Sequence, residues 1–298
     1  MLLLSMPQKQ RNISVTLIGS GNLAQALGPA LRNAGYIIDV VVSRESADSR
    51  WRASRFARKL GAKVQSIEEF EPKSKLIWLL HTDDALGKTA SALAGSGTWK
   101  SRLVFHSSGA LTSDVLAPLK RAGAYTASLH PMMTFVPGSA PDMAAVPFAV
   151  EGDRRAVAAG KKIAGDLGAE VFEIRKENKV LYHALGSFSS PMLVATLVTA
   201  ERVGRAAGLA PAQTRKIMRP ILEQTLRNYF SRGAAAAFSG PIKRGDLETI
   251  GRHLRELARV PEARDVYRAL VKSGLVDLPS GKKRELLKLM TRKATKNY

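Results

Sequence analysis

The sequence of 298 residues contains no cysteine, which excludes disulfide bonds, thiolate metal sites and a cysteine nucleophile. It has five histidines, and because nothing in their spacing fixes a ligand geometry we expect no metal site. No segment approaches the roughly 18 consecutive apolar residues of a membrane helix. The N-terminal run Met1-Leu2-Leu3-Leu4 is too short for a signal peptide. These absences favour a cytoplasmic protein without a membrane segment.

Acidic residues are scarce relative to basic ones. The chain has 25 Asp and Glu against 46 Lys and Arg, a formal net charge of +21. Such a surplus attracts polyanions, but a phosphate-rich cofactor and an acidic substrate account for the same sign. We therefore expect a small anionic substrate and do not expect nucleic acid to be the main partner.

Short β-rich runs alternate with helical patterns through the first half of the chain. Strands are predicted at residues 15–18, 36–43, 75–80, 103–106, 125–129, 148–151 and 170–174, with helices at 22–34 and 47–60 between the first of them. After residue 174 only helical patterns follow. The sequence thus predicts an α/β fold, with a doubly wound, mostly parallel Rossmann sheet over residues 12–174 and an all-α domain over residues 175–298.

A glycine-rich turn follows the first predicted strand. Gly19-Ser20-Gly21-Asn22-Leu23-Ala24 matches the pattern G-x-G-x-x-A and opens a helix. Gly19 permits the tight turn, Gly21 lets the backbone approach a pyrophosphate, and Ala24 allows close packing. The free N–H groups at the helix N-terminus bind the phosphates. The pattern predicts a dinucleotide site at Gly19, Ser20, Gly21, Asn22 and Leu23.

The end of the second predicted strand distinguishes NADP(H) from NAD(H). An NAD-binding protein usually places Asp or Glu there to bind the ribose 2′-hydroxyl. Here the position reads Ser43-Arg44, and an arginine binds a 2′-phosphate through two N–H donors. We therefore predict NADP(H) as the cofactor.

Polar residues also follow the later strands. Ligands of such sheets lie beyond the carboxyl ends of the strands. His81 and Thr82 come after the strand at 75–80, and we assign them to the cofactor. Ser107, Ser108 and Gly109 follow the next strand and His130 the one after it, and we assign these four to the substrate.

A long helical pattern over residues 176–209 carries a polar stripe. Lys179, His183, Ser187 and Ser190 are spaced by four, four and three residues, and so share one helix face. Because Leu181, Leu185, Phe188, Met192 and Val194 lie on other faces, we expect the helix to be buried on several sides, with Pro191 ending or kinking it. A buried lysine is costly unless it faces a ligand or an anion.

These positions suggest a role in proton transfer. A desolvated lysine or histidine is a suitable proton donor to an oxygen or nitrogen whose carbon receives hydride. Lys179 and His183 are therefore the predicted catalytic residues, with Ser187 near the substrate. The alternative is a polar stripe that faces solvent or a partner subunit. A later charged loop, residues 240–246, offers Arg244 to an anionic substrate.

Several of these segments together resemble a known family. The chain is similar to Rossmann-like proteins with a C-terminal DUF2520 domain in the glycine turn and in five further segments: His106-Ser107-Ser108-Gly109-Ala110-Leu111, Ser128-Leu129-His130-Pro131-Met132-Met133-Thr134-Phe135, Phe148-Ala149-Val150-Glu151-Gly152-Asp153, Tyr182-His183-Ala184, and Gly240-Pro241-Ile242-Lys243-Arg244-Gly245-Asp246. That family resembles the 6-phosphogluconate dehydrogenase-like superfamily, near the pyrroline-5-carboxylate reductases and β-hydroxyacid dehydrogenases.

The resemblance implies an N-terminal NADP-binding domain and a homodimer built through the helical domain. In the β-hydroxyacid dehydrogenases a lysine early in the first interdomain helix donates the proton, and an asparagine follows one turn later. Lys179 matches that lysine by position, whereas His183 stands in the place of the asparagine. The proton relay of those enzymes is therefore not carried over intact.

Three functions are compatible with these observations. The leading one is an NADP(H)-dependent oxidoreductase that transfers hydride to or from a small oxo, hydroxy or imino acid at an interdomain cleft. The second is a non-catalytic NADP(H)-binding sensor or scaffold with a basic partner-binding surface. The third is an imine reductase similar to pyrroline-5-carboxylate reductase.

Overall fold

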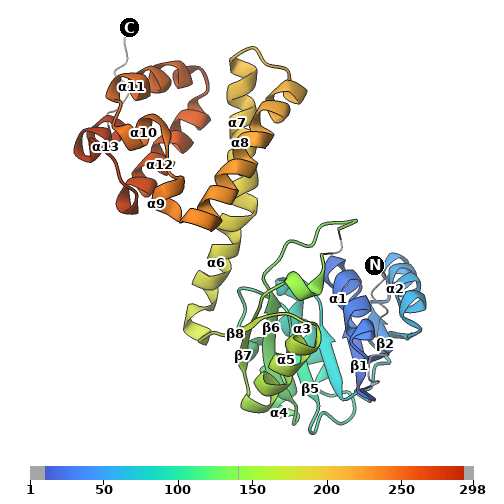
Figure 1. Cartoon of the computed structure of the whole chain (residues 1–298). Coiled ribbons are helices and arrows are strands. Elements are labelled where there is room, and N and C mark those ends of the chain that lie inside the picture. The colour runs from blue at the N-terminus through green and yellow to red at the C-terminus, as the bar shows by residue number, and fades with distance from the viewer. Residues whose placement is uncertain (1–10, 140, 292–298) are drawn as a thin grey trace, which may run out of the picture. The chain divides into compact units, whose positions relative to one another are not determined.

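A computed structural model describes residues 11–139 and 141–291, so the N-terminal run Met1–Leu4 lies outside the described residues. The chain forms two compact units, Met1–Phe188 and Ser189–Tyr298, which we call the sheet unit and the helical unit. Figure 1 shows the strands confined to the first unit. The predicted domain boundary at residues 174 and 175 falls just after the last strand and stays a prediction.

The sheet unit is built on eight strands in the order β3-β2-β1-β4-β5-β6-β7-β8. Neighbouring strands are parallel except for β6 and β7, which are antiparallel. The strands are β1 Ser14–Ile18, β2 Ile37–Ser43, β3 Lys63–Ser66, β4 Leu76–Leu79, β5 Leu103–His106, β6 Tyr125–Pro131, β7 Phe148–Gly152 and β8 Val171–Glu173.

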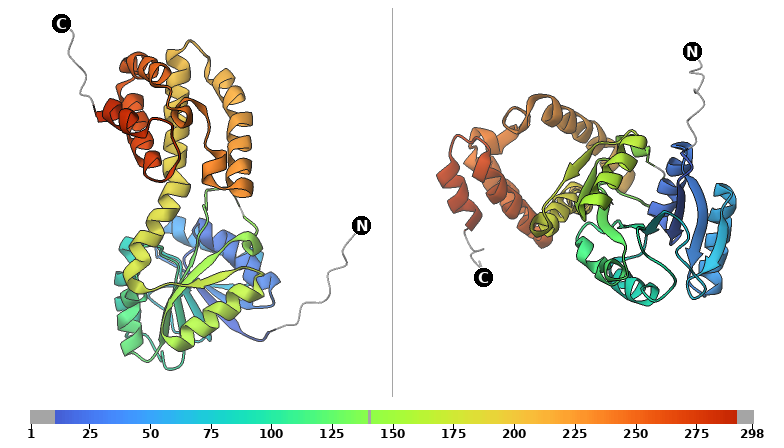
Figure 2. Two further views of the ribbon diagram at one scale, coloured as in Figure 1. Left: turned by 60° about the vertical axis from the view of Figure 1, so that its left-hand side comes forward. Right: turned by 90° about the horizontal axis from the view of Figure 1, so that it is seen from below.

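Helices cover both faces of this sheet (Figure 2). One apolar core lies beneath α1 (Asn22–Asn33), α2 (Ala47–Leu60) and α5 (Arg154–Asp166). The other lies beneath α3 (Asp83–Leu93), η1 (Ser113–Leu116) and α4 (Ala117–Arg121). The short helices η2 (Met143–Ala145) and η3 (Lys176–Asn178) lie in the connections. A central strand must be apolar on both sides to pack in this way, and β4 is buried at all four positions. The predicted α/β fold with a mostly parallel Rossmann sheet is confirmed.

Among the eight strands, β3 is the one that the sequence did not predict. It is an edge strand with the sequence Lys-Val-Gln-Ser, and its first two residues are exposed. An exposed edge strand needs no apolar run, so its composition resembles that of a loop.

The helical unit contains no strand among its described residues. Its helices are α7 Pro191–Ala206, α8 Pro211–Arg232, α9 Ala234–Ala237, α10 Gly240–Arg244, α11 Leu247–Glu256, η4 Leu257–Arg259, α12 Pro261–Asp277 and α13 Lys283–Thr291. A small core joins α11, α12 and α13. The prediction of a charged loop at residues 240–246 is wrong in part. Residues 240–244 form helix α10, and Gly245, with φ 70°, follows as its C-cap.

The helical pattern that begins near residue 176 is divided, as the proline predicts. Helix α6 (Lys179–Ser189) ends before Pro191, which occupies the first position of α7. The expected burial of this segment is wrong. Leu181 is 71% exposed and Phe188 68% exposed, whereas Lys179 is 0% exposed. Helix α6 therefore directs polar side chains toward the sheet and leaves apolar ones outside.

The helical stretch of residues 176–206 is long and apolar enough to cross a membrane by length and composition, because it contains an 18-residue window with a mean hydropathy of 1.2. The core helix of a water-soluble protein has the same composition. This property alone therefore does not distinguish a membrane segment from a helix covered by protein.

Candidate functional site

The glycine turn between β1 and α1 has the backbone that a phosphate-binding turn requires. Gly19 has φ +115°, and a Cβ atom there would lie 2.9 Å from the carbonyl oxygen of Leu80. Gly21 is the N-cap of α1, and nothing lies within 4 Å of the position that its Cβ would take. The side-chain amide of Asn22 donates from Nδ2 to the carbonyl of Phe135 at 3.0 Å, so it leaves the backbone N–H groups unused. The turn thus leaves open space beside the free N–H groups of the helix.

The residues at the end of β2 lie beside this turn. Ser43 is buried, and its Oγ has no hydrogen-bond partner among the described residues. Arg44 is exposed, and its backbone N–H donates to Ser49 Oγ at 3.3 Å. A buried hydroxyl without a partner is uncommon, and it fits a position that a ligand oxygen completes.

His81 and Thr82 follow β4 at the same edge of the sheet. The ring of His81 shares a 2.9 Å hydrogen bond with the hydroxyl of Thr89. Burial lowers the pKa of His81, and the nearby charge of Arg44 lowers it further. Thr82 is the exposed N-cap residue of α3. The four residues Ser43, Arg44, His81 and Thr82 thus lie at or just after the ends of strands β2 and β4, which flank β1.

A second cluster begins with a polar row across three neighbouring strands. His106 of β5 is in register with Ser128 of β6, which is in register with Glu151 of β7. Residues paired in this way project from the same face of a sheet. All three side chains are buried. A buried polar row is costly unless each member is hydrogen-bonded or paired.

Lys179 lies over this row. Its Nζ donates to Ser128 Oγ at 2.5 Å and lies 4.0 Å from Glu151 Oε1. Burial lowers the pKa of Lys179 to about 8, while the charges of Glu151 and Asp83 raise it. The amine therefore holds a proton at neutral pH but releases it far more readily than an exposed lysine.

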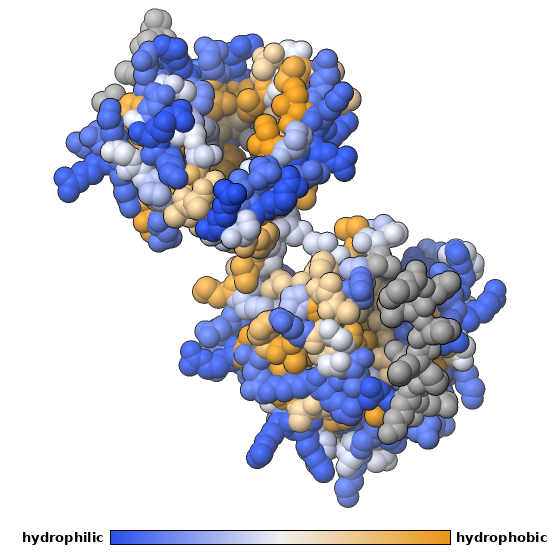
Figure 3. All heavy atoms as spheres, viewed as in Figure 1, coloured by the Kyte–Doolittle hydropathy of each residue, from blue (hydrophilic) through white to orange (hydrophobic). Residues whose placement is uncertain are grey.

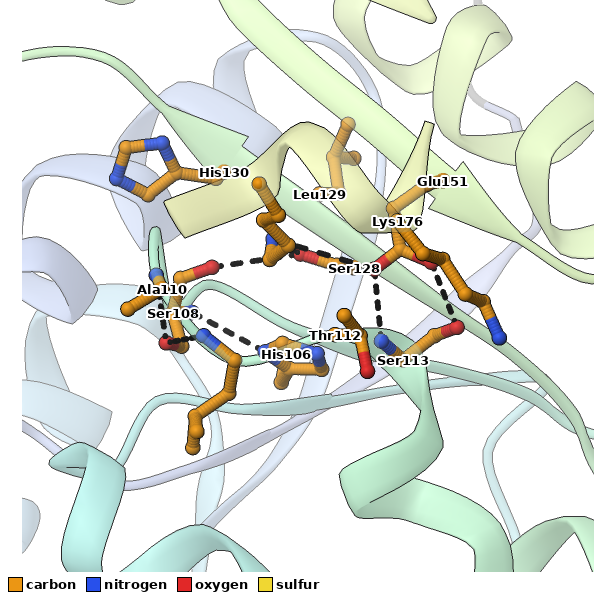
Figure 4. A network of polar contacts seen from close by, with 12 residues as sticks. His106, Ser108, Ala110, Thr112, Ser113, Ser128, Leu129, His130, Glu151 and Lys176 are labelled. Carbon is orange, nitrogen blue, oxygen red and sulfur yellow. Dashed lines mark hydrogen bonds and ion pairs between the residues drawn. The ribbon is translucent and has the colours of Figure 1, made fainter. Parts of the chain in front are cut away.

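Glu151 is held from the opposite side by Ser113, the first residue of η1. Its Oε1 accepts the backbone N–H of Ser113 at 2.7 Å, and its Oε2 accepts the hydroxyl at 2.8 Å (Figure 4). Both oxygens are thus fixed by donors. This carboxylate is the anion that the buried lysine requires, and its Oε1 lies 4.0 Å from Lys179 Nζ.

The neighbouring histidines are neutral. Burial lowers the pKa of His106 to about 3, and the charge of Lys179 contributes. Burial and then Lys179 likewise lower the pKa of His130 to about 3. His106 Nδ1 accepts the N–H of Ser108 at 3.1 Å, so the proton of its neutral ring lies on Nε2. His130 Nδ1 shares a 3.1 Å hydrogen bond with the hydroxyl of Tyr182.

Gly109 allows these rings to approach the loop after β5. A Cβ atom at this position would lie 2.3 Å from His183 Cδ2 and 2.8 Å from His130 Nε2. The rings of His130 and His183 meet edge to face with centroids 6.0 Å apart. His183 is exposed, whereas His130 is half-buried. The side chains that accompany Lys179 to this edge are therefore Tyr182, half-buried, and His183.

The predicted substrate residues are placed unevenly. Gly109 and His130 belong to this cluster. The hydroxyl of Ser107 accepts from Trp78 Nε1 and donates to the carbonyl of Leu129, while Ser108 Oγ accepts two backbone N–H groups. Their hydroxyls thus shape the loop.

Two further residues were predicted to bind the substrate, Ser187 and Arg244. Ser187 Oγ donates to the carbonyl of His183 within α6. Arg244 is exposed on the helical unit.

Sequence reasoning did not single out Ser113, Ser128, Glu151 or Tyr182 as site residues. Ser128, Glu151 and Tyr182 lie in segments that carry the family resemblance, and for Ser128 and Glu151 the available signal was a polar residue inside an otherwise apolar strand. Their common register depends on the antiparallel pairing of β6 with β7, which the sequence did not predict.

The neutral histidines generate a prediction for stability against pH. His106 and His130 have pKa values of about 3 in the folded protein and about 6.5 when unfolded, so the unfolded chain binds more protons at acid pH. The free energy of unfolding of the sheet unit should therefore fall from pH 6 to 4.5. Each histidine contributes a slope of about 1.4 kcal/mol per pH unit. Urea unfolding followed by tryptophan fluorescence measures it, since Trp51, Trp78 and Trp99 all lie in this unit.

His130→Gln should remove about half of that histidine-dependent slope. His253→Gln, at an exposed position in the helical unit, is the matched control. An identical slope in wild type and His130→Gln would contradict the buried, neutral state of His130.

Comparison with known proteins places this geometry in a family context. Residues 5–131 match the Rossmann-like domain model and residues 146–273 match the model described as a domain of unknown function, DUF2520. No curated protein matched the chain.

Solved structures with the same fold cover nearly the whole chain. A Bacteroides fragilis protein provisionally described as an NADP oxidoreductase is 26% identical with a TM-score of 0.73, covering 89% of this chain and 98% of its own. A Thermotoga maritima protein is 24% identical with a TM-score of 0.69, covering 93% and 100%. An imine reductase from Myxococcus stipitatus, solved with NADP+, is 17% identical with a TM-score of 0.60, covering 93% and 94%. The chain therefore combines a Rossmann-like domain with a DUF2520 domain, as its motifs predicted.

Proposed function

We propose that this protein is an NADP(H)-dependent oxidoreductase that transfers hydride to or from a small oxo, hydroxy or imino acid. The observation that carries the proposal is the position of two clusters on one sheet. The glycine turn follows β1, and the Lys179 cluster surrounds the ends of β5 and β6, so both belong to the carboxyl edge. A nucleotide and a reacting group bound at one edge lie within reach of each other.

The residues present fit NADP(H). Open space lies beside Gly21, the hydroxyl of Ser43 is buried without a partner, and Arg44 follows with an exposed side chain. A guanidinium matches a 2′-phosphate, and no acidic residue occupies the position that a free ribose 2′-hydroxyl requires. The solved neighbours described with NADP support the same cofactor.

Reduction of such a substrate requires a proton as well as a hydride. Bound NADPH supplies the hydride, and the oxygen or nitrogen of the reduced bond then needs a proton. Helix α6 offers two sources. The buried amine of Lys179 donates a hydrogen bond to Ser128, whereas His183 is exposed beside Gly109 and His130. We assign proton delivery to this pair and keep an anionic oxo or imino acid as the substrate class.

We also propose that a second copy of the chain covers the apolar side chains that the fold leaves outside. In the helical unit Phe230 is 81% exposed and Ile221 61% exposed, and Figure 3 shows apolar residues at the surface over α7 and α8. An exposed apolar patch of this kind marks an interaction surface. A homodimer built there accounts for the apolar composition of α7 without a membrane.

The cofactor assignment predicts a preference that a fluorescence titration measures. NADPH should bind at least about tenfold more tightly than NADH, because the 2′-phosphate adds charge-assisted hydrogen bonds. Arg44→Ala should remove most of this preference and leave NADH affinity nearly unchanged. Arg58→Ala, in the last turn of α2, makes the same charge change away from the turn and is the control. Equal affinities in the wild type would refute the assignment to Ser43 and Arg44.

Substitutions in α6 test the proton donors. Lys179→Met should lower turnover by about a hundredfold or more while NADPH affinity stays nearly constant, since general acids contribute about that much. His183→Asn should lower turnover if the exposed imidazole delivers the proton directly. Steady-state rates with a panel of oxo and imino acids, beside NADPH titrations of each variant, separate the two. Full turnover in Lys179→Met would exclude Lys179 from the reaction.

The dimer is tested by light scattering in the absence of detergent. The wild type should have the mass of two chains, and Phe230→Glu should shift the equilibrium toward one chain, because it places a charge in an apolar interface. Arg227→Glu, a charge change on the same helix, is the control for a general effect of charge. A monodisperse monomer for the wild type would contradict the proposal, and so would a protein that detergent alone keeps in solution.

A further inference from the structure

The proposed function leaves the buried carboxylate of Glu151 without a role. Its side chain is 3% exposed, and it lies on β7 in register with Ser128. Burying an ionised group costs several kcal/mol unless charge and hydrogen bonds compensate. The surroundings of Glu151 supply both: Ser113 donates hydrogen bonds, and Lys179 provides the opposite charge.

Ser113 fixes the carboxylate from one side. Its backbone N–H and its hydroxyl donate to the two oxygens at 2.7 Å and 2.8 Å. Oε1 also faces Lys179 Nζ at 4.0 Å. Because both oxygens accept hydrogen bonds, the carboxylate carries its charge at a low cost and cannot turn away from the amine.

The other charged groups near Lys179 do not replace this carboxylate. Asp83, at the start of α3, also raises the pKa of Lys179, but by less than Glu151 does. Burial makes His106 and His130 neutral. Lys176 contacts Asp114 at 2.5 Å, and that hydrogen bond is the largest cause that raises the pKa of Lys176. Glu151 is thus the acidic group that lies nearest to Lys179 in the described residues.

We infer that Glu151, held in place by Ser113, is a positioning residue that keeps Lys179 protonated at neutral pH although the amine is fully buried. Only the use of that proton rests on the proposed function. A fully buried lysine without an anion loses its proton well below the pH at which an exposed one does. With Glu151 in place, Lys179 keeps a proton to deliver through the hydrogen bond that it makes with Ser128.

The test is an NMR titration of the Lys179 side-chain amine in the full chain without cofactor or substrate, with the signal assigned by its loss in Lys179→Met. Glu151→Gln keeps the size of the side chain and an acceptor for the Ser113 N–H but removes the charge. The titration midpoint of Lys179 should then fall by about one pH unit or more, the shift expected for an opposite charge at this distance.

Glu173→Gln is the matched control. Glu173 lies on the adjacent strand β8, is exposed and pairs with Lys161 at 2.6 Å, so the same charge change should leave the midpoint in place. Ser113→Ala is a second variant, and it should produce a smaller fall, because one of the two donors that orient the carboxylate is lost. An unchanged midpoint in Glu151→Gln would overturn the inference. If that variant does not fold, an unchanged midpoint in Ser113→Ala overturns it instead.

A turnover profile separates this inference from the proposed function. If Lys179 is the proton donor, the alkaline limb of the pH profile of turnover should move to lower pH in Glu151→Gln, together with the NMR midpoint. A moved midpoint with an unmoved profile supports the role of Glu151 and contradicts Lys179 as donor. A midpoint that stays in place overturns the role of Glu151 whatever the turnover does.

Discussion

The buried ion pair of Lys179 and Glu151, with Nζ and Oε1 4.0 Å apart, is the interaction on which the candidate site depends. A charged amine enters the interior of the sheet unit only because a carboxylate and the hydroxyl of Ser128 receive it. Its charge in turn helps to keep His106 and His130 neutral. The register of β5, β6 and β7 brings these partners together, so the antiparallel strand β7 contributes a residue to the candidate site as well as to the sheet.

The same ion pair explains why α6 turns its polar side chains toward the sheet. Helix α6 places Lys179, Tyr182 and His183 toward the sheet, which leaves its apolar residues on the outside. A helix with this distribution is stable in water only when something else covers its apolar face. The polar face of α6 thus carries the candidate site, while its apolar face stays exposed, as do apolar residues of α8 in the helical unit.

Much of the fold followed from the sequence, because buried parallel strands are continuous apolar runs and the glycine turn marks where β1 meets α1. The edge strand β3 did not, since exposure removes that signal. Within the site, Lys179 and His183 were predicted from their helical spacing. Glu151 and Ser128 were not, because they belong together only through a pairing of strands. The burial of α6 was predicted wrongly because an apolar composition does not say which molecule covers it.

We propose that one edge of this sheet both binds NADP(H) and supports hydride transfer. The most direct measurement follows deuterium from NADPH labelled at the transferable position into the product of a panel of oxo and imino acids, by mass spectrometry. The account predicts one deuterium at the reduced carbon with the wild type and a strongly diminished amount with Lys179→Met. Tight NADPH binding without transfer to any member of the panel would contradict it and would favour a nucleotide-binding sensor.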